Sequence, residues 1–93
     1  MSAEVVEVTL TLTNPTGLHA RPAKDFVQTA NRFAATIRVR SGARTANAKS
    51  IFDTLQLQAR QGAELIITAE GADAAAAVAA LTELVNSRFG EDA

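Results

Sequence analysis

Within the stretch VEVTLTLTNPTGLHARPAKDFV, residues 6–27, the spacing of the apolar residues changes. In its first eight residues, valine and leucine alternate with glutamate and threonine, which is typical of a strand with one buried face. The residues NPTG then predict a turn. After the turn, apolar residues recur at helical spacing. Pro22 has no N–H to donate and fits only the first turn of a helix, so we expect this helix to start near His19 or Ala20.

The same two periods predict the remaining elements. Alternation predicts further strands at residues 35–41, 44–48 and 63–71, with a turn at Gly42 between the first two. Helical spacing predicts helices at residues 49–58 and from residue 73 to a stop at Gly90, and residues 91–93 are expected to be a frayed tail. The order β-α-β-β-α-β-α predicts an α+β domain in which helices cover one face of a four-stranded sheet.

The two later helices have candidate N-caps. Ser50 precedes one of them, and Asp53 follows three residues later, which resembles a capping box. Asp73 occupies the corresponding position before the last helix. We expect both side chains to accept hydrogen bonds from unpaired N–H groups of the first turn.

Composition narrows the functional classes. With 93 residues, a single domain spanning 1–93 is expected, and a formal net charge of −1 argues against a nucleic-acid partner. The absence of cysteine excludes disulfides and thiolate chemistry, and one histidine without cysteine excludes the usual zinc sets. We expect no cofactor, no metal, no signal peptide and no membrane-spanning segment, so a cytoplasmic protein is the default.

The single histidine, His19, has two interpretations. A lone histidine at such a position is most often a cap or an ordinary surface residue. At a helix start, however, the unpaired N–H groups and the positive dipole end disfavour an imidazolium and would accept an anion. We therefore expect a neutral, nucleophilic ring, with Arg21 close enough to bind the same anion. No acid, base or metal set accompanies them, so we predict a phosphohistidine rather than an enzyme that turns over a small substrate.

The motif GLHARPA at residues 17–23 resembles the active-site motif of the HPr family, the histidine-containing phosphocarriers of the bacterial phosphoenolpyruvate-dependent sugar phosphotransferase system. AKSIF at residues 48–52 and QGAELIITAEGADA at residues 61–74 match as well, and the resemblance runs from about Val6 to Leu84. It implies an open-faced β-sandwich, with three helices on one face of a four-stranded antiparallel sheet.

The resemblance also implies roles for individual residues. Enzyme I, phosphorylated from phosphoenolpyruvate, would phosphorylate the Nδ1 atom of His19 with help from Arg21, and the carrier would pass the phosphoryl group to enzyme IIA domains. In many relatives an ATP-dependent kinase, the HPr kinase/phosphorylase, phosphorylates a serine that matches Ser50. A transcriptional regulator is a further partner that the resemblance suggests.

An apolar patch beside the histidine is the candidate docking surface. Ala20 flanks His19, and Ile51, Phe52 and Leu55 lie close together on the short second helix by their spacing. The competing interpretation places the last three in the core, and for Leu55 both interpretations are open. A short one-sided helix cannot bury every apolar residue it carries, so we expect one or two of them to be exposed.

The chain departs from the family pattern at several points. SGAR replaces the usual Asn-Gly-Lys turn, which suggests a shifted turn, and Gln58 replaces a glycine at the end of the second helix. Gln28, Asn31 and Asp53 occupy positions where some relatives carry lysines, so we expect less acidic partners. Two other functions stay open: a related carrier that serves nitrogen or transcriptional control, and a small metabolite-binding module without phosphate chemistry.

Overall fold

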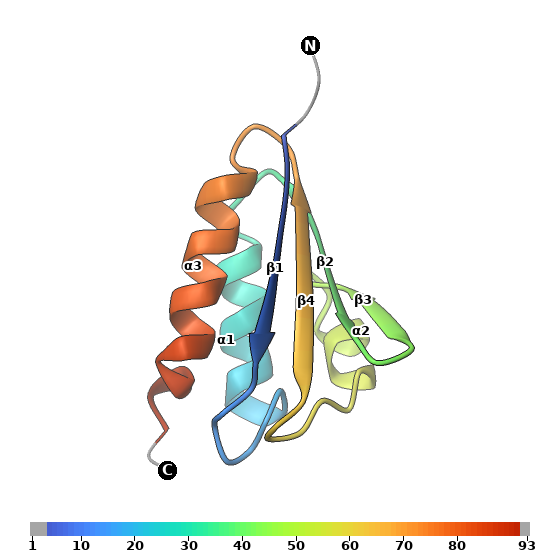
Figure 1. The fold of residues 1–93 in the computed structure, drawn as a ribbon, viewed down its shortest axis with the longest axis vertical. Helices are drawn as coiled ribbons and strands as arrows, with labels where there is room; N and C mark the ends of the chain where they lie inside the picture. The colour runs from blue at the N-terminus through green and yellow to red at the C-terminus, as the bar shows by residue number, and fades with distance from the viewer. Residues whose placement is uncertain (1–3, 92–93) are drawn as a thin grey trace.

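A computed structural model describes residues 4–91 and has helices on one face of a four-stranded antiparallel sheet (Figure 1). The elements are β1 (Val5–Thr11), α1 (Ala20–Ala30), β2 (Thr36–Ser41), β3 (Arg44–Asn47), α2 (Ile51–Gln56), β4 (Glu64–Glu70), α3 (Ala74–Asn86) and the short 3-10 helix η1 (Arg88–Gly90). The strand order is β1-β4-β2-β3. The predicted α+β class and open-faced sandwich are confirmed.

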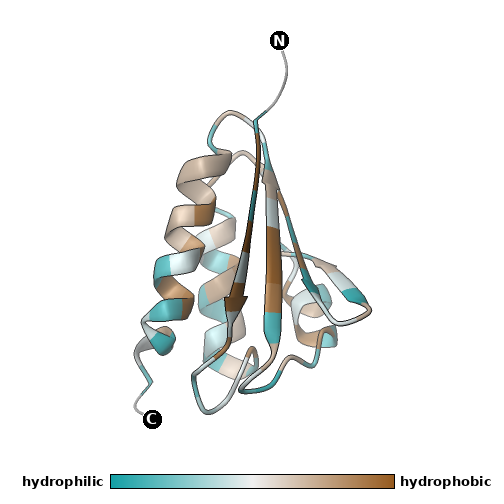
Figure 2. Cartoon of the chain, in the orientation of Figure 1, coloured by the Kyte–Doolittle hydropathy of each residue, from teal (hydrophilic) through white to brown (hydrophobic). Residues whose placement is uncertain are grey.

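The alternation in the strands matches the two faces of the sheet. The central strand β4 pairs antiparallel with β1 and with β2, so that Ile67 lies between Val8 and Val39. Leu65, Ile67 and Ala69 are buried on the helical side, and the residues between them face away from the helices. Figure 2 shows the apolar residues that run along β1 and β4.

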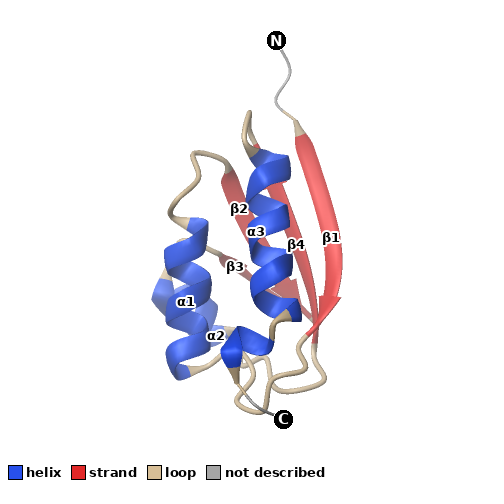
Figure 3. Cartoon of the chain, turned by 90° about the vertical axis from the view of Figure 1, so that its left-hand side faces the viewer, coloured by secondary structure: helices blue, strands red, loops and turns tan. Residues whose placement is uncertain are grey.

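Two long helices and one short helix close the core. Phe26 of α1 and Leu81 and Val85 of α3 are fully buried in one cluster with the sheet side chains. The short helix α2 packs against β3 and α1, at the edge of the layer (Figure 3). This arrangement brings the start of α1 and the whole of α2 to the same end of the molecule. Between residues 4 and 91, no helix has the length and apolar character needed to cross a membrane.

The prediction that the Asp73 side chain caps the last helix is wrong. Asp73 occupies the N-cap position of α3, but its side chain makes no cap hydrogen bond. Its carboxylate instead accepts hydrogen bonds of 2.8 Å from the backbone N–H groups of Ala34 and Ala35, in the loop before β2. The bond from Ala34 is the main reason that the pKa of Asp73 is lowered. The carboxylate therefore joins α3 to a loop that is distant in the sequence.

Candidate functional site

His19 is the N-cap residue of α1, as the position of Pro22 predicts. Its backbone is extended, with φ −138°, and its side chain is exposed and makes no cap hydrogen bond. The interpretation of His19 as a helix-capping side chain is therefore not supported. The first N–H groups of α1 lack helical partners and lie beside an imidazole that is accessible from solvent. Within residues 4–91, no group of three or more histidine or acidic side chains is placed so that it could hold a metal ion.

The turn before His19 is packed tightly against the segment after α2. Gly17 has φ +64°, and a Cβ added there would lie 2.5 Å from the carbonyl oxygen of Ala59 and 2.8 Å from the Cα of Arg60. The N–H of Leu18 donates a 2.9 Å hydrogen bond to the same Ala59 oxygen. Leu18 itself is buried. The position of His19 is thus fixed by contacts that only glycine at residue 17 permits.

Two residues beside the site have left-handed backbone conformations although they are not glycine. Ala20 has φ +51° at the start of α1, and Gln58 has φ +53° just after α2. This conformation costs roughly 1–2 kcal/mol for a residue with a Cβ. A glycine, which the family resemblance implies at the position of Gln58, would avoid this cost. In this chain the left-handed conformation follows α2 although glutamine occupies the position.

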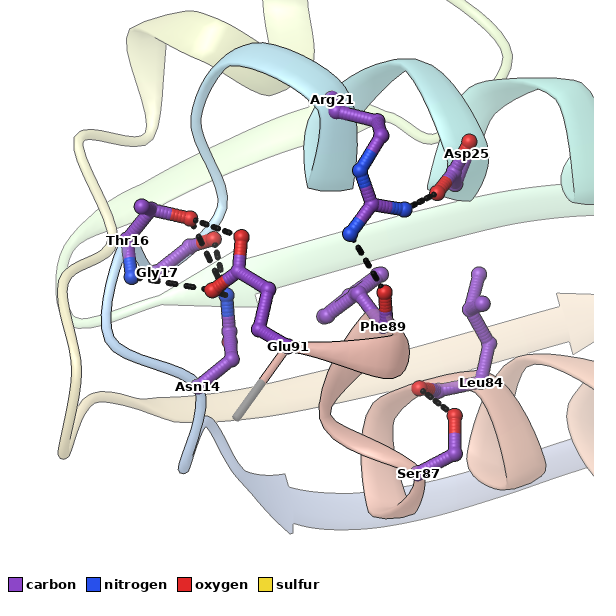
Figure 4. A network of polar contacts seen from close by, with 9 residues as sticks. All are labelled: Asn14, Thr16, Gly17, Arg21, Asp25, Leu84, Ser87, Phe89 and Glu91. Carbon is purple, nitrogen blue, oxygen red and sulfur yellow. Dashed lines mark hydrogen bonds and ion pairs between the residues drawn. The ribbon is translucent and has the colours of Figure 1, made fainter. Parts of the chain in front are cut away.

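Arg21 is engaged with its own chain. Its side chain is 55% exposed. Nη1 donates to the carboxylate of Asp25 at 2.8 Å, and Nη2 donates to the carbonyl oxygen of Phe89 at 2.7 Å (Figure 4). The C-terminal turn η1 therefore lies directly against the first turn of α1.

Glu91 connects the C-terminal segment to the turn before His19. Its carboxylate accepts hydrogen bonds from the Thr16 hydroxyl at 2.7 Å, the Thr16 N–H at 3.3 Å and the amide of buried Asn14 at 3.1 Å (Figure 4). The Thr16 hydroxyl is the main reason that the pKa of Glu91 is lowered. The predicted frayed tail is wrong at Glu91, while residues 92–93 lie outside the described part. No local pattern could have revealed a contact between residues so distant in the sequence.

We expect Glu91→Gln to be less stable than the parent protein at neutral pH and equally stable in acid. Because the pKa of Glu91 is lower in the folded state than in the unfolded chain, its ionised form stabilises the fold above the unfolded value. That contribution is lost as the pH falls through the folded value. Urea unfolding of both proteins at pH 7 and at about pH 3 measures the difference. A difference of the same size at both values would contradict a role for the charge.

Most residues of the candidate docking patch line a hollow together with His19. Phe52 is 75% exposed and is therefore not a core residue, whereas Ile51 and Leu55 are half-buried and Ala20 is exposed. A hollow of about 460 Å³ between α1 and α2 is lined by His19, Ala20, Lys24, Val27, Gln28, Ile51 and Leu55. Three of the four proposed patch residues thus surround one hollow beside the histidine, and Phe52 is exposed on the same short helix.

Ser50 is the N-cap residue of α2. Its hydroxyl oxygen accepts a 3.3 Å hydrogen bond from the N–H of Asp53, as the sequence predicts. The reciprocal bond of a capping box is absent, because the Asp53 carboxylate accepts from the N–H of Asn47, at 3.4 Å. Ser50 is half-buried, and its neighbour in the chain is Ile51 of the docking patch.

Comparisons with known proteins point in one direction. The family model described as "PTS HPr component phosphorylation site" matches residues 6–87. The phosphocarrier protein HPr of Xylella fastidiosa is 40% identical over 88 residues, which cover 95% of this chain and 99% of that protein. The crystal structure of HPr-C-His from Thermoanaerobacter tengcongensis superposes with a TM-score of 0.92 at 45% identity, covering 95% and 99% of the two chains.

A longer protein also contains a similar segment. The phosphoryl donor subunit DhaM of the phosphoenolpyruvate-dependent dihydroxyacetone kinase of Providencia stuartii is 39% identical over 79 residues. The match covers 85% of this chain but only 17% of that subunit.

Proposed function

Because this chain belongs to the HPr family of phosphocarrier proteins, we propose that it accepts a phosphoryl group on His19 from phosphorylated enzyme I and passes it to enzyme IIA domains. The observation that carries the proposal is the exposed imidazole at the start of α1, within the segment that the family's phosphorylation-site model matches. In the transfer from enzyme I, the bond between phosphorus and the donor residue breaks while a phosphorus–nitrogen bond to the imidazole of His19 forms. In the transfer to enzyme IIA, the bond to His19 breaks while a new bond to the acceptor residue forms.

The first turn of α1 supports a phosphoryl group in this position. Its N–H groups have no helical partners and the positive end of the helix dipole lies there, so an anion is favoured. Pro22 contributes no N–H, but its fixed φ suits the first turn. Arg21 uses two of its five donors on Asp25 and Phe89, which leaves three for phosphoryl oxygens. We propose that these remaining donors stabilise the transferring group.

The direct test is incubation with phosphoenolpyruvate and the cognate enzyme I, followed by mass spectrometry of the intact protein. We expect a mass gain of one phosphoryl group that is lost in acid and retained in base, as for a phosphohistidine. Omission of enzyme I is the control and should leave the mass unchanged. Absence of the gain with an enzyme I that phosphorylates another HPr would contradict the proposal.

We propose that Phe52 and the hollow beside His19 form the surface on which both partners dock. Phe52→Ala should weaken binding to enzyme I and to enzyme IIA roughly tenfold or more, because burial of a phenylalanine in an interface contributes about 1.5–3 kcal/mol. Its melting temperature should change little, since the side chain is 75% exposed. Titration calorimetry with each partner measures the affinities.

Val5→Ala is the matched control for this prediction. Val5 is the other exposed large apolar residue of the described chain, at 60%, and it lies on the edge strand β1. It should leave both affinities unchanged. Equal losses in the two variants, or a loss of stability without a loss of affinity in Phe52→Ala, would place the docking surface elsewhere.

We further propose that phosphorylation of Ser50 by a regulatory kinase slows transfer to His19. Ser50→Asp should retain the cap, because aspartate caps as well as serine does, while it adds a negative charge beside Ile51. We expect slower phosphorylation by enzyme I at an unchanged melting temperature. Ser50→Asn is the uncharged control with the same capping ability. Equal rates for the aspartate and asparagine variants would leave Ser50 with the role of a cap alone.

A second candidate function is a carrier for a pathway other than sugar import, including nitrogen or transcriptional control. The similarity to part of a phosphoryl donor subunit favours this alternative over a module that only binds a metabolite. Both carrier functions use the same chemistry at His19. They differ in the acceptor, so transfer from the phosphorylated protein to purified enzyme IIA domains separates them.

A further inference from the structure

We propose that Arg60 is a second cationic residue of the phosphorylation site and binds the phosphoryl group once His19 carries it. This inference rests on the proposed function, because it needs a phosphoryl group at His19. The motif around the histidine contains Arg21 but gives no indication of Arg60, which follows a different helix. The proposal therefore depends on how the chain folds and not on the motif.

The backbone of Arg60 is held against the turn that precedes His19. The Leu18 N–H donates to the carbonyl oxygen of Ala59 at 2.9 Å, and the Cα of Arg60 is 2.8 Å from the position of a Cβ on Gly17. A further backbone bond, from the N–H of Ala63 to the oxygen of Arg60, also measures 2.9 Å. These contacts place Arg60 in one layer with the residues that lead directly into His19.

Arg60 and His19 line the same hollow. This second hollow, of about 400 Å³, is lined by Thr16, Leu18, His19, Leu55, Gln58, Ala59 and Arg60. It lies on the side of His19 toward the segment after α2, whereas the apolar hollow of the docking patch lies between α1 and α2. Arg60 therefore forms part of the wall around a phosphoryl group on His19 that is directed into this second hollow.

The charge of the Arg60 side chain is not neutralised by an acidic partner within residues 4–91. Arg60 is exposed, and within residues 4–91 its side chain has no hydrogen-bond or ion-pair partner. Arg21, by contrast, is bound to Asp25 and to Phe89. A guanidinium binds a phosphoryl dianion through parallel charge-assisted hydrogen bonds, and an unpaired one does so without first breaking an ion pair. Arg60 therefore has its whole guanidinium available to a phosphoryl group, whereas Arg21 offers only the three donors that Asp25 and Phe89 leave free.

The inference can be tested with phosphoramidate, a small donor that needs no partner protein. Its phosphorus–nitrogen bond breaks, ammonia leaves, and a phosphorus–nitrogen bond to His19 forms. The pH titration of the phosphohistidine signal is then followed by phosphorus NMR. A nearby cation favours the dianion, so Arg60→Gln should raise the midpoint pH of the titration by roughly 0.5. Arg60→Lys should restore most of the parent value.

Arg40→Gln is the matched control, because Arg40 is an exposed arginine of β2 on the face of the sheet away from the helices. Its midpoint should equal that of the parent protein. An unchanged midpoint in Arg60→Gln would overturn the inference, even if transfer from enzyme I became slower, because the cation would then serve the partner's surface. Labelling by phosphoramidate but not by enzyme I would contradict the proposed function. The titration midpoints of the Arg60 variants would still test the role of Arg60.

Discussion

Replacement of His19 by alanine is expected to abolish phosphorylation by phosphoenolpyruvate and enzyme I while the fold is retained. His19 is the only histidine of the chain, so no second imidazole can accept the group. Its side chain is exposed and makes no cap hydrogen bond. Removal of such a side chain changes the free energy of unfolding by less than about 0.5 kcal/mol. Mass spectrometry measures the first effect and thermal unfolding the second.

Arg40→Gln is a suitable control for the His19 variant. Arg40 is exposed on the face of the sheet away from the helices and lines neither hollow beside His19. It should be phosphorylated to the same extent as the parent protein. Persistent acid-labile phosphorylation of His19→Ala would show that the acceptor is another residue. Loss of folding in that variant would show that the imidazole has a structural role that its exposure does not suggest.

Gly17→Ala is expected to destabilise the protein by roughly 2–5 kcal/mol and to slow phosphorylation of His19. The left-handed conformation at φ +64° costs about 1–2 kcal/mol for alanine. The new Cβ would also lie 2.5 Å from the Ala59 oxygen, and relief of this overlap costs a further 1–3 kcal/mol or so. The neighbouring atoms are backbone, and the Ala59 oxygen already accepts from Leu18, so relief must displace the turn before His19.

Gly42→Ala separates the two contributions. Gly42 has a similar φ of +60°, but a Cβ there would meet no atom within 4 Å. It should therefore show only the conformational cost, about 1–2 kcal/mol, and normal phosphorylation. Denaturant unfolding of both variants provides the comparison. Equal losses of stability would mean that the contact between the turn and the segment after α2 contributes nothing.

Local patterns in the sequence were sufficient for the elements and for the place of the histidine. The alternation before the turn predicts β1, and the position of Pro22 predicts a helix start at His19 or Ala20, which is where α1 begins. Ser50 is predictable as a cap because its partner, Asp53, is three residues away. These predictions succeed because each depends on residues within one or two turns of the chain.

Predictions from the sequence are wrong where a polar group binds a partner that is distant in the chain. Asp73 occupies the predicted N-cap position, but its carboxylate binds the N–H groups of Ala34 and Ala35. The sequence predicts a frayed tail at Glu91, yet Glu91 accepts three hydrogen bonds from the turn before His19. A carboxylate that is free to cap its own helix can gain as much from unpaired donors elsewhere, and helix periodicity contains no information about where those donors lie.

The sequence by itself determined the order of strands and helices along the chain. It also determined that one imidazole lies at a helix start, with an arginine two residues later. The tertiary structure alone decided what surrounds that imidazole. It brings Arg60 against Gly17, attaches Glu91 to Thr16, and leaves Phe52 exposed. The physical reason is that secondary structure depends on the period of neighbouring side chains, whereas the surroundings of His19 depend on how separate elements pack against the sheet.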